Sequence, residues 1–281
     1  MTDPAPVAAI EARAARMRYD IIEMIAEAGS GHPGGSLSAA EIVATLYFGV
    51  MKHDPARPAW AERDRFVLSK GHAAPVLYAA LAEAGYLGRD QLKTLRKLGS
   101  ILQGHPDCKK TPGVEISTGS LGQGLAIANG IALGLRLDRS ESRVFCLLGD
   151  GELQEGEVWE AAMFAAHHGL DHVVAIVDHN GLQIDGACTD VMCLGEVAQK
   201  FKAFGWEVRE INGHSVAELI EAISAAPAAP GVPVCVVART VKGKGVSFME
   251  GNAGWHGKAP DAEQTAAALA ELGSLLEVGS R

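Results

Sequence analysis

Two polar side chains, Asp150 and Asn180, follow two apolar segments and could together bind a metal. Asp150 lies between two glycines in "CLLGDGELQEG", directly after a predicted buried strand. Asn180 follows the apolar segment "HVVAIVD", one predicted helix and one predicted strand later. In a βαβ unit the carboxyl ends of both strands lie side by side, so we expect the two side chains to converge. Carboxylate, amide and backbone carbonyl oxygens, completed by phosphate oxygens, suit Mg²⁺ or Ca²⁺.

The glycines on either side of Asp150 fit a phosphate ligand. Gly149 and Gly151 permit a tight turn and let another group approach the backbone closely. The amides at the start of the following helix would then help to hold a diphosphate. A lone Gly-Asp-Gly is more often an ordinary turn. Its pairing with an asparagine at the next strand end favours the metal interpretation.

Among the ten histidines, four that lie next to glycine in predicted loops are candidates for proton transfer. They are His32, His72, His105 and His256. Taken singly, a loop histidine is more often a surface residue or an ordinary hydrogen-bonding group. Together, four such residues suit a reaction that moves protons on and off hydroxyl groups near neutral pH. The remaining histidines are interpreted as structural: His53, His167, His168, His172, His179 and His214.

These residues need a framework, and the apolar pattern predicts an α/β fold. Predicted strands alternate with helices, and the strands are continuous Val/Ile/Leu segments, which is typical of a parallel sheet with helices on both faces. Ser36 or Ser38 is expected to cap the second helix, and a single helix is expected over 191–204. The strands are predicted in "RFVL", "RVFCLL", "HVVAIVD", "EVREI" and "VPVCVVART", and the helices over 8–27 and in "SLSAAEIVATLYFGV", "APVLYAALAEAGYL", "LAIANGIALGLRL", "GEVWEAAMFAAHHG" and "SVAELIEAIS".

Composition limits the possible partners. The chain of 281 residues has a formal net charge of −9, which argues against a general binder of nucleic acid or anionic membranes. No apolar stretch approaches the length of a membrane span, and no secretory signal is visible. Five scattered cysteines without a CxxC pair favour free thiols in a reducing cytosol over a zinc site. We therefore expect a cytoplasmic protein.

A dinucleotide site is disfavoured. The glycines of "TGSLGQG" lack the GxGxxG spacing, and no strand leads directly into them. The segment that contains them, "GHPDCKKTPGVEISTGSLGQG", is long and irregular, and such segments in compact domains are more often functional than idle.

The combined motifs resemble the transketolase family over nearly the whole chain. Gly-Asp-Gly followed by an asparagine about thirty residues later is similar to the thiamin-diphosphate motif, and "GDGELQEG" is similar to its transketolase form. Deoxyxylulose-phosphate synthase is a relative that lacks the Leu-Gln-Glu-Gly continuation. Further segments resemble transketolase in family order: "SGHPGGSLS", "DRFVLSKGHAAPVLYAALAEAGYL", "GHPD", "TGSLGQGLAIANG", "FGW", "NGHSVAEL", "KGKG" and "GWHGKAP".

The resemblance implies a role for individual residues around thiamin diphosphate. Asp150, Asn180 and the Leu182 carbonyl would bind the metal, Mg²⁺ or Ca²⁺. His32 and His105 would hold hydroxyls of the donor sugar, and His72 and His256 would contact the diphosphate, with His256 also facing substrate. Glu155 is implied at a subunit interface. Further implied contacts are Gly149, Gly151 and Glu152 as the backbone cradle, Gly119 and Leu121 at the diphosphate and aminopyrimidine region, and Lys242 and Lys258 at the rim of the site.

The resemblance also implies that a second chain is needed. The sequence ends shortly after "WHGKAP", where the first domain of the family should end, and a pyrimidine-binding domain is lacking. We expect a diphosphate-binding domain over residues 1–262, a C-terminal helix and tail over 263–281, and an α2β2 assembly with a partner subunit. The expected activity is two-carbon ketol transfer between sugar phosphates, as in the pentose phosphate reactions. Two alternatives stay open: a related ketol-transferring or synthase subunit for an unusual sugar phosphate or sulfosugar, and a non-catalytic thiamin-diphosphate-binding module.

Overall fold

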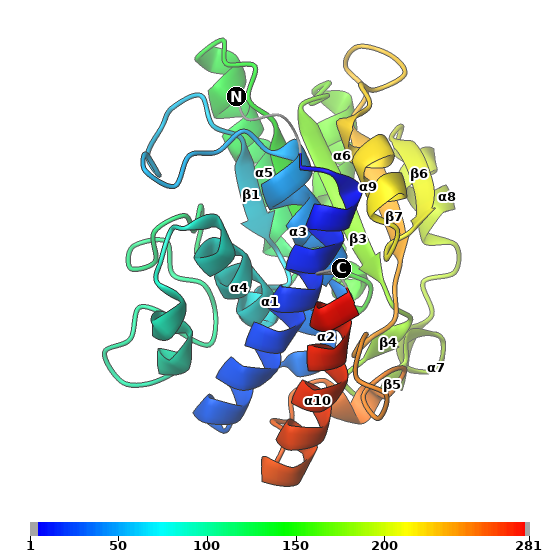
Figure 1. Cartoon of the computed structure of the whole chain (residues 1–281). Coiled ribbons are helices and arrows are strands. Elements are labelled where there is room, and N and C mark those ends of the chain that lie inside the picture. Colours follow the sequence, from blue (N-terminus) through cyan, green and yellow to red (C-terminus); the bar gives the residue numbers. More distant parts are fainter. Residues whose placement is uncertain (1–4, 279–281) are drawn as a thin grey trace.

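Five parallel strands form the central sheet of the computed structural model, which describes residues 5–278. The strand order is β1-β2-β3-β7-β6, and every neighbouring pair is parallel (Figure 1). All five predicted strands are present. They are β1 (Arg65–Leu68), β2 (Val144–Gly149), β3 (Val173–His179), β6 (Glu207–Asn212) and β7 (Val234–Arg239), and a separate antiparallel pair is formed by β4 (Leu182–Gln183) and β5 (Gly186–Ala187).

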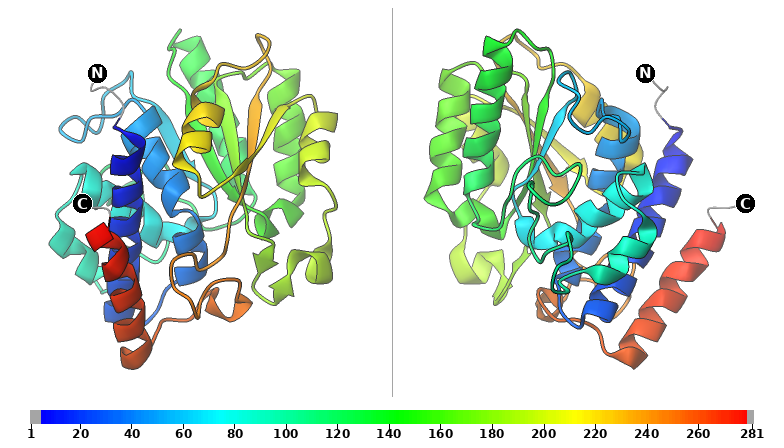
Figure 2. Two further views of the ribbon diagram at one scale, coloured as in Figure 1. Left: turned by 45° about the vertical axis from the view of Figure 1, so that its right-hand side comes forward. Right: turned by 90° about the vertical axis from the view of Figure 1, so that its left-hand side faces the viewer.

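Helices cover both faces of the sheet, as the sequence predicts (Figure 2). Successive strand residues point to opposite faces, so Phe145 and Leu147 of β2 enter one core while Cys146 and Leu148 enter the other. Both cores are apolar, which is why β1, β2, β3 and β7 contain continuous apolar segments, whereas the edge strand β6 does not. One core is covered by α1 (Val7–Ala28), α3 (Ala40–Thr45), α4 (Ala74–Ala84), α9 (Val216–Ser224) and α10 (Ala262–Val278), and the other by α5 (Gln123–Leu137), α6 (Gly156–His167) and α8 (Val197–Ala203).

Short helical segments connect these elements. Two are α-helical, namely α2 (Pro33–Ser38) and α7 (Cys188–Met192), and one, Leu46–Val50, is a π-helix. The remainder are 3₁₀ turns at Gly71–Ala73, Arg89–Thr94, Gly151–Gln154 and Ala253–Trp255. No helix of the described residues is both long and apolar enough to cross a membrane.

Two sequence expectations about helix boundaries are wrong. Neither Ser36 nor Ser38 caps a helix, because α2 begins earlier, at Pro33, where proline favours the first helical position. The helix expected over 191–204 is interrupted between α7 and α8, where Gly195 adopts a φ of 62° that a helix does not allow. The division at residue 262 stays a prediction, and residues 279–281 of the expected tail lie outside the described residues.

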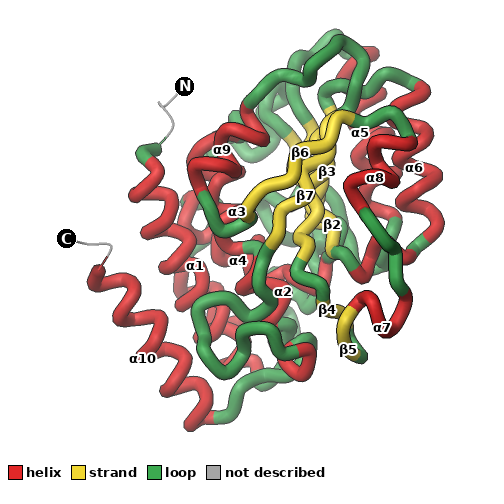
Figure 3. The backbone as a smooth tube through the Cα atoms, turned by 90° about the vertical axis from the view of Figure 1, so that its right-hand side faces the viewer, coloured by secondary structure: helices red, strands yellow, loops and turns green. Residues whose placement is uncertain are grey.

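The loops that follow the strands converge at one edge of the sheet. Figure 3 shows α2, β4, β5 and α7 at this edge, beyond the ends of the strands. The segments after β1, β2, β3 and β7 carry Lys70, Asp150, Asn180 and Lys242 respectively. The fold therefore brings residues from four strand ends to one place, where parallel sheets bind ligands.

Candidate functional site

The structure brings Asp150 and Asn180 to adjacent strand ends. Gly149 at the end of β2 pairs with Asp178 of β3, and the Asp150 carboxylate accepts hydrogen bonds from the amides of Gly151 (2.9 Å) and Gly181 (2.5 Å). Asn180 Oδ1 accepts from the amide of Leu182 at 3.1 Å. The 3%-exposed Asp150 is thus held by backbone amides with its oxygens at the edge of the sheet.

Glu152 braces this turn with its side chain, which the sequence did not predict. Its carboxylate is 2% exposed and accepts hydrogen bonds from the amides of Gly149 (2.9 Å) and Gly122 (3.1 Å) and from the Ser69 hydroxyl. Burial raises the pKa of Glu152, although those hydrogen bonds oppose the rise. Glu152 thereby links the loops after β1 and β2 to the start of α5.

Lys70 and Asp178 form a buried ion pair under the site, which sequence reasoning missed. Their side chains are 2% and 0% exposed, and Lys70 also donates to the Gly35 carbonyl at 2.8 Å. Asp178 accepts further hydrogen bonds from the hydroxyls of Ser38 (2.6 Å) and Thr240. Burial opposes ionisation of Asp178, but Lys70 and these donors keep its pKa below the usual range. The sequence offers only one indication of this pair: each residue lies at the end of a predicted strand, in a segment that also contains a candidate site residue.

Three of the four candidate histidines meet in one cluster. The ring centroids of His32, His72 and His256 lie 5.1–5.4 Å apart. Lys242, 3% exposed, places its Nζ 2.9 Å from His256 Nδ1 and 3.5 Å from the Leu182 carbonyl. The cluster thus lies next to the Asp150 and Asn180 turn, because Leu182 belongs to the segment that follows Asn180.

The fourth histidine, His105, joins the cluster through Arg96, which sequence reasoning also missed. Arg96 lies 3.4 Å from His32 Nδ1, and its charge disfavours protonation of both His32 and His105. Its backbone has a φ of 61°, which is unusual for a residue other than glycine. Gly119 packs against the His105 ring so closely that a Cβ there would approach a ring carbon to 2.9 Å.

Burial and neighbouring cations keep these imidazoles neutral. Burial lowers the pKa of His32 to about 4, and Arg96 adds to this shift. Burial, followed by the charge of Lys242, lowers the pKa of His256 to about 3. Burial, followed by Lys70, lowers the pKa of His72 well below its usual range. A neutral imidazole can both donate and accept a hydrogen bond, so the cluster can hold hydroxyl groups and accept a proton from one.

Two further predicted residues, Lys258 and Glu155, have exposed side chains. Lys258 is exposed and its Nζ lies 5.0 Å from the ring centroid of Trp255. Glu155 is exposed and packs beside Gly122. Their expected roles, at the rim and at an interface, stay predictions.

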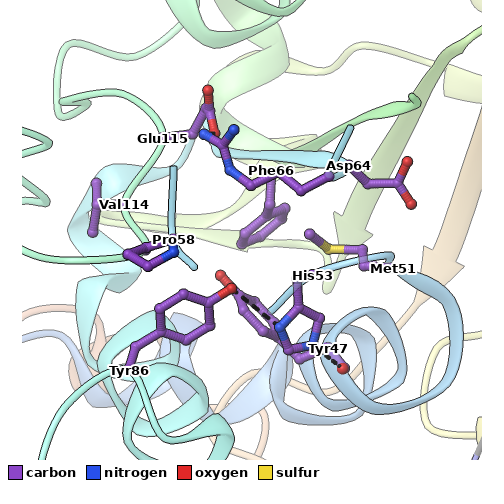
Figure 4. Close-up of a pocket in the computed structure, with 11 residues that line it drawn as sticks. Tyr47, Met51, His53, Pro58, Asp64, Phe66, Tyr86, Val114 and Glu115 are labelled. Carbon is purple, nitrogen blue, oxygen red and sulfur yellow. Dashed lines mark hydrogen bonds and ion pairs between the residues drawn. The ribbon is translucent and has the colours of Figure 1, made fainter. Parts of the chain in front are cut away.

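A pocket elsewhere in the molecule is lined by polar groups that mostly pair with one another (Figure 4). It lies beside the amino end of β1, whereas Lys70 follows the other end of this strand. His53 is engaged by the Tyr86 hydroxyl at 3.1 Å and the Tyr47 carbonyl at 2.6 Å, and Arg63 pairs with Glu115 at 2.6 Å. Because these groups satisfy one another, the histidine cluster is the better candidate site.

Comparison with known proteins identifies the family. Residues 10–276 match the family described as "Transketolase, thiamine diphosphate binding domain". The chain belongs to the transketolase family. In a solved structure, the transketolase of Campylobacter jejuni superposes on 96% of the chain with a TM-score of 0.90 and 36% identity. The expected thiamin-diphosphate-binding fold is therefore confirmed.

Relatives of this transketolase-family chain differ in length. It is 46% identical over 251 residues to the 6-deoxy-6-sulfo-D-fructose transketolase subunit of Clostridium sp. (strain MSTE9), covering 89% of this chain and 91% of that subunit. It is 40% identical over 271 residues to an apulose-4-phosphate transketolase subunit of Phocaeicola vulgatus, covering 96% of each. Against human transketolase the identity is 44%, with 91% of this chain but only 41% of that protein covered. The chain thus matches separate subunits nearly end to end and less than half of a longer transketolase.

The site of this transketolase-family chain fits a diphosphate held through a cation. The described residues contain no group of three or more His, Cys, Asp or Glu side chains that could hold a metal. A cation beside Asp150 would have the Asn180 amide oxygen, a backbone carbonyl and oxygens of the ligand itself as further ligands, a donor set that suits Mg²⁺ or Ca²⁺. The turn favours glycine at position 151, because a Cβ there would lie 3.0 Å from the Gln183 side chain.

Proposed function

We propose that this chain is the diphosphate-binding subunit of a two-chain transketolase that transfers a two-carbon ketol unit from a ketose phosphate to an aldose phosphate. The observation that carries the proposal is the near end-to-end match to relatives named as transketolase subunits, together with a match to less than half of longer transketolases. The partner would supply the pyrimidine-binding domain, and the assembly would be α2β2. The free state of all five cysteines supports a cytoplasmic location.

Each site residue has a proposed task. Asp150, Asn180 and the Leu182 carbonyl would bind Mg²⁺ or Ca²⁺, and Gly149, Gly151 and Glu152 would form the turn beneath the diphosphate. Thiamin diphosphate, when bound, supplies a nucleophilic carbon that no amino-acid side chain offers. Further contacts to this cofactor would come from His72, Gly119, Leu121, Lys242 and His256.

The histidines would act on the sugar. Neutral His32 and His105 would hold hydroxyls of the donor, and an imidazole of the cluster would accept the proton of the hydroxyl beside the breaking bond. His256 would face both cofactor and substrate. The low pKa values of His32 and His256, about 4 and about 3, keep both rings in the form that can accept this proton at neutral pH.

Two alternatives differ from this proposal in substrate or activity. A subunit for a sulfosugar is favoured by the relative named for 6-deoxy-6-sulfo-D-fructose. A thiamin-diphosphate-binding module without activity is disfavoured, because Asp150, Asn180 and all four histidines are kept and are brought together.

Reconstitution tests the function. The chain would be co-expressed with a pyrimidine-domain chain encoded beside it and assayed with thiamin diphosphate, Mg²⁺ and a panel of donors. The panel contains ketose phosphates, apulose 4-phosphate and 6-deoxy-6-sulfo-D-fructose. We expect two-carbon transfer by the pair and no turnover by either chain alone. A pair that neither binds the cofactor nor transfers a two-carbon unit contradicts the proposal.

The metal ligand can be tested separately. Asp150→Ala removes a charged ligand, so we expect loss of Mg²⁺-dependent thiamin diphosphate binding while the circular dichroism spectrum is retained. Asp185→Ala removes an exposed carboxylate near β4 and serves as the matched control. Titration by fluorescence quenching measures the affinity, and unchanged binding by Asp150→Ala rejects the metal assignment.

A further inference from the structure

His214 lies outside the histidine cluster but is held firmly in the turn between β6 and α9. Its backbone amide donates to the Asn212 side chain at 3.0 Å, and the next residue, Ser215, caps α9 by accepting from the Glu218 amide at 3.3 Å. The His214 side chain is 14% exposed and points to Glu41 of α3. The motif "NGHSVAEL" therefore builds a fixed turn whose histidine faces the protein interior.

Glu41 accepts hydrogen bonds from two sides. Both terminal nitrogens of Arg18 on α1 contact its carboxylate, Nη1 at 2.6 Å, and His214 Nδ1 contacts it at 2.9 Å. Burial of Glu41 opposes ionisation, but Arg18 and His214 lower its pKa to about 2. Since the carboxylate can only accept, His214 Nδ1 must be the donor.

The other ring nitrogen of His214 also takes part in a hydrogen bond. The backbone amide of Val241 donates to His214 Nε2 at 2.9 Å. A nitrogen that accepts this bond carries no proton, so the imidazole is neutral with its hydrogen on Nδ1. One ring therefore connects a buried carboxylate to the backbone of the segment after β7.

The segment held in this way carries Lys242. Its side chain packs on Gly34, where a Cβ would lie 3.0 Å from Lys242 Cγ, and Gly243 donates to the Gly34 carbonyl at 3.0 Å. Arg18 also lies against this segment: its Cδ is 3.1 Å from the position that a Cβ would occupy at Gly245. Lys242 Nζ in turn lies 2.9 Å from His256 Nδ1.

We propose that Arg18, Glu41 and His214 form a positioning triad that fixes the backbone at Val241 and thereby holds Lys242 in the cofactor site. The inference rests on the proposed function, since Lys242 is assigned there to the cofactor. His214 is a positioning residue in this scheme: it acts through Val241 and touches neither substrate nor cofactor.

Two substitutions separate positioning from general stability. In His214→Gln the side-chain oxygen occupies the place of Nε2 and can still accept from Val241, but the donor to Glu41 is lost. In His214→Asn the amide nitrogen occupies the place of Nδ1 and can still donate to Glu41, but the acceptor for Val241 is lost. Each variant loses one hydrogen bond, so both lower stability. The positioning role predicts in addition that they differ in cofactor affinity and in amide exchange of the segment after β7. His172→Asn, at the amino end of β3, is the control for removal of a histidine.

The readouts are amide exchange over residues 239–251 and the affinity of the assembled two-chain protein for thiamin diphosphate with Mg²⁺. In His214→Asn we expect exchange to accelerate and affinity to fall by about 3- to 10-fold, the range that one lost hydrogen bond gives. In His214→Gln, which keeps the acceptor for Val241 but loses the link to Glu41, we expect a smaller loss in both readouts than in His214→Asn. In His172→Asn we expect both readouts to stay within about twofold of the unmodified protein.

Failure of the inference is distinguishable from failure of the proposed function. If the unmodified assembly binds the cofactor and the Asn and Gln variants bind it equally well, the positioning role is wrong. If the unmodified assembly binds no thiamin diphosphate, the proposed function is wrong, whatever the exchange data give. If neither variant folds, amide exchange of the unmodified chain still tests the inference. Rapid exchange of the Val241 amide would overturn it, and protection like that of the β7 amides would support it.

Discussion

At the scale of single residues, each partner of the buried pair of Lys70 and Asp178 should be needed for the stability of the fold. Removing one partner leaves an uncompensated buried charge, which costs about 3–5 kcal/mol. We therefore expect Lys70→Met and Asp178→Asn each to be strongly destabilising. The double variant should cost less than the sum of the two, because it leaves no isolated charge. Urea unfolding of the four proteins measures the coupling, and additive losses would contradict it.

The charge of Arg96 should affect the titration of the neighbouring histidines. Its charge helps to lower the pKa of His32 to about 4 and also lowers that of His105. Arg96→Gln removes the charge, so the protonated imidazoles become less unfavourable and both pKa values should rise. Histidine NMR titration measures the change, with Arg136→Gln at the far end of α5 as the control. Unchanged values for both rings would rule out the electrostatic role.

At the scale of elements, two glycines of α5 should respond oppositely to alanine. A Cβ at Gly124 would lie 2.2 Å from the Ser69 Oγ and 2.7 Å from its Cα, whereas a Cβ at Gly130 would meet nothing within 4 Å. Alanine is favoured over glycine in a helix by up to about 1 kcal/mol. We expect Gly130→Ala to raise the urea midpoint and Gly124→Ala to lower it by separating α5 from the loop after β1. Equal shifts in one direction would refute this account of the packing.

The elements themselves were predictable, and the reason is local. Four strands of the sheet contain consecutive apolar residues, whereas β6, at the edge of the sheet, has only Val208 and Ile211. The glycines around Asp150 mark the turn at the end of β2. The convergence of Asp150 and Asn180 also follows, because strand order in a βαβ unit decides which ends are neighbours. The boundaries at Pro33 and Gly195 were missed because a serine in one case and an apolar pattern in the other gave a competing signal.

The contacts that complete the site could not be predicted in this way. Lys70 and Asp178 are 108 positions apart, and Glu41 and His214 are 173 apart. Nothing near either residue of a pair indicates its partner, since only the packed sheet and helices bring them together. His214 shows the difficulty, because without Glu41 and Val241 it is an ordinary polar residue in a turn.

At the scale of the whole molecule, the neutral histidines should make the protein sensitive to mild acid. In the unfolded chain a histidine gains its proton as the pH falls below about 6.5. In the folded protein the pKa values of His32 and His256 are about 4 and about 3, so both rings stay neutral to much lower pH. Between these limits the unfolded state binds more protons, and the free energy of unfolding must therefore decrease as the pH falls.

This decrease can be assigned to the cluster by removing one ring. His32→Asn lacks one of the depressed groups, so its stability should fall less steeply than that of the unmodified protein between pH 6.5 and 4, by at most about 1.4 kcal/mol per pH unit. Glu41 does not affect this comparison. Its pKa is about 2 in the folded protein and 4.5 ordinarily, so the stability that its ionisation contributes is lost only below about pH 4.5, at the acid end of the range. Urea unfolding at half-unit pH intervals, with exposed His167→Asn as the control, gives the slopes. Parallel curves for His32→Asn and the unmodified protein would mean that the folded protein protonates His32 as readily as the unfolded chain does, and the neutral cluster would then be wrong.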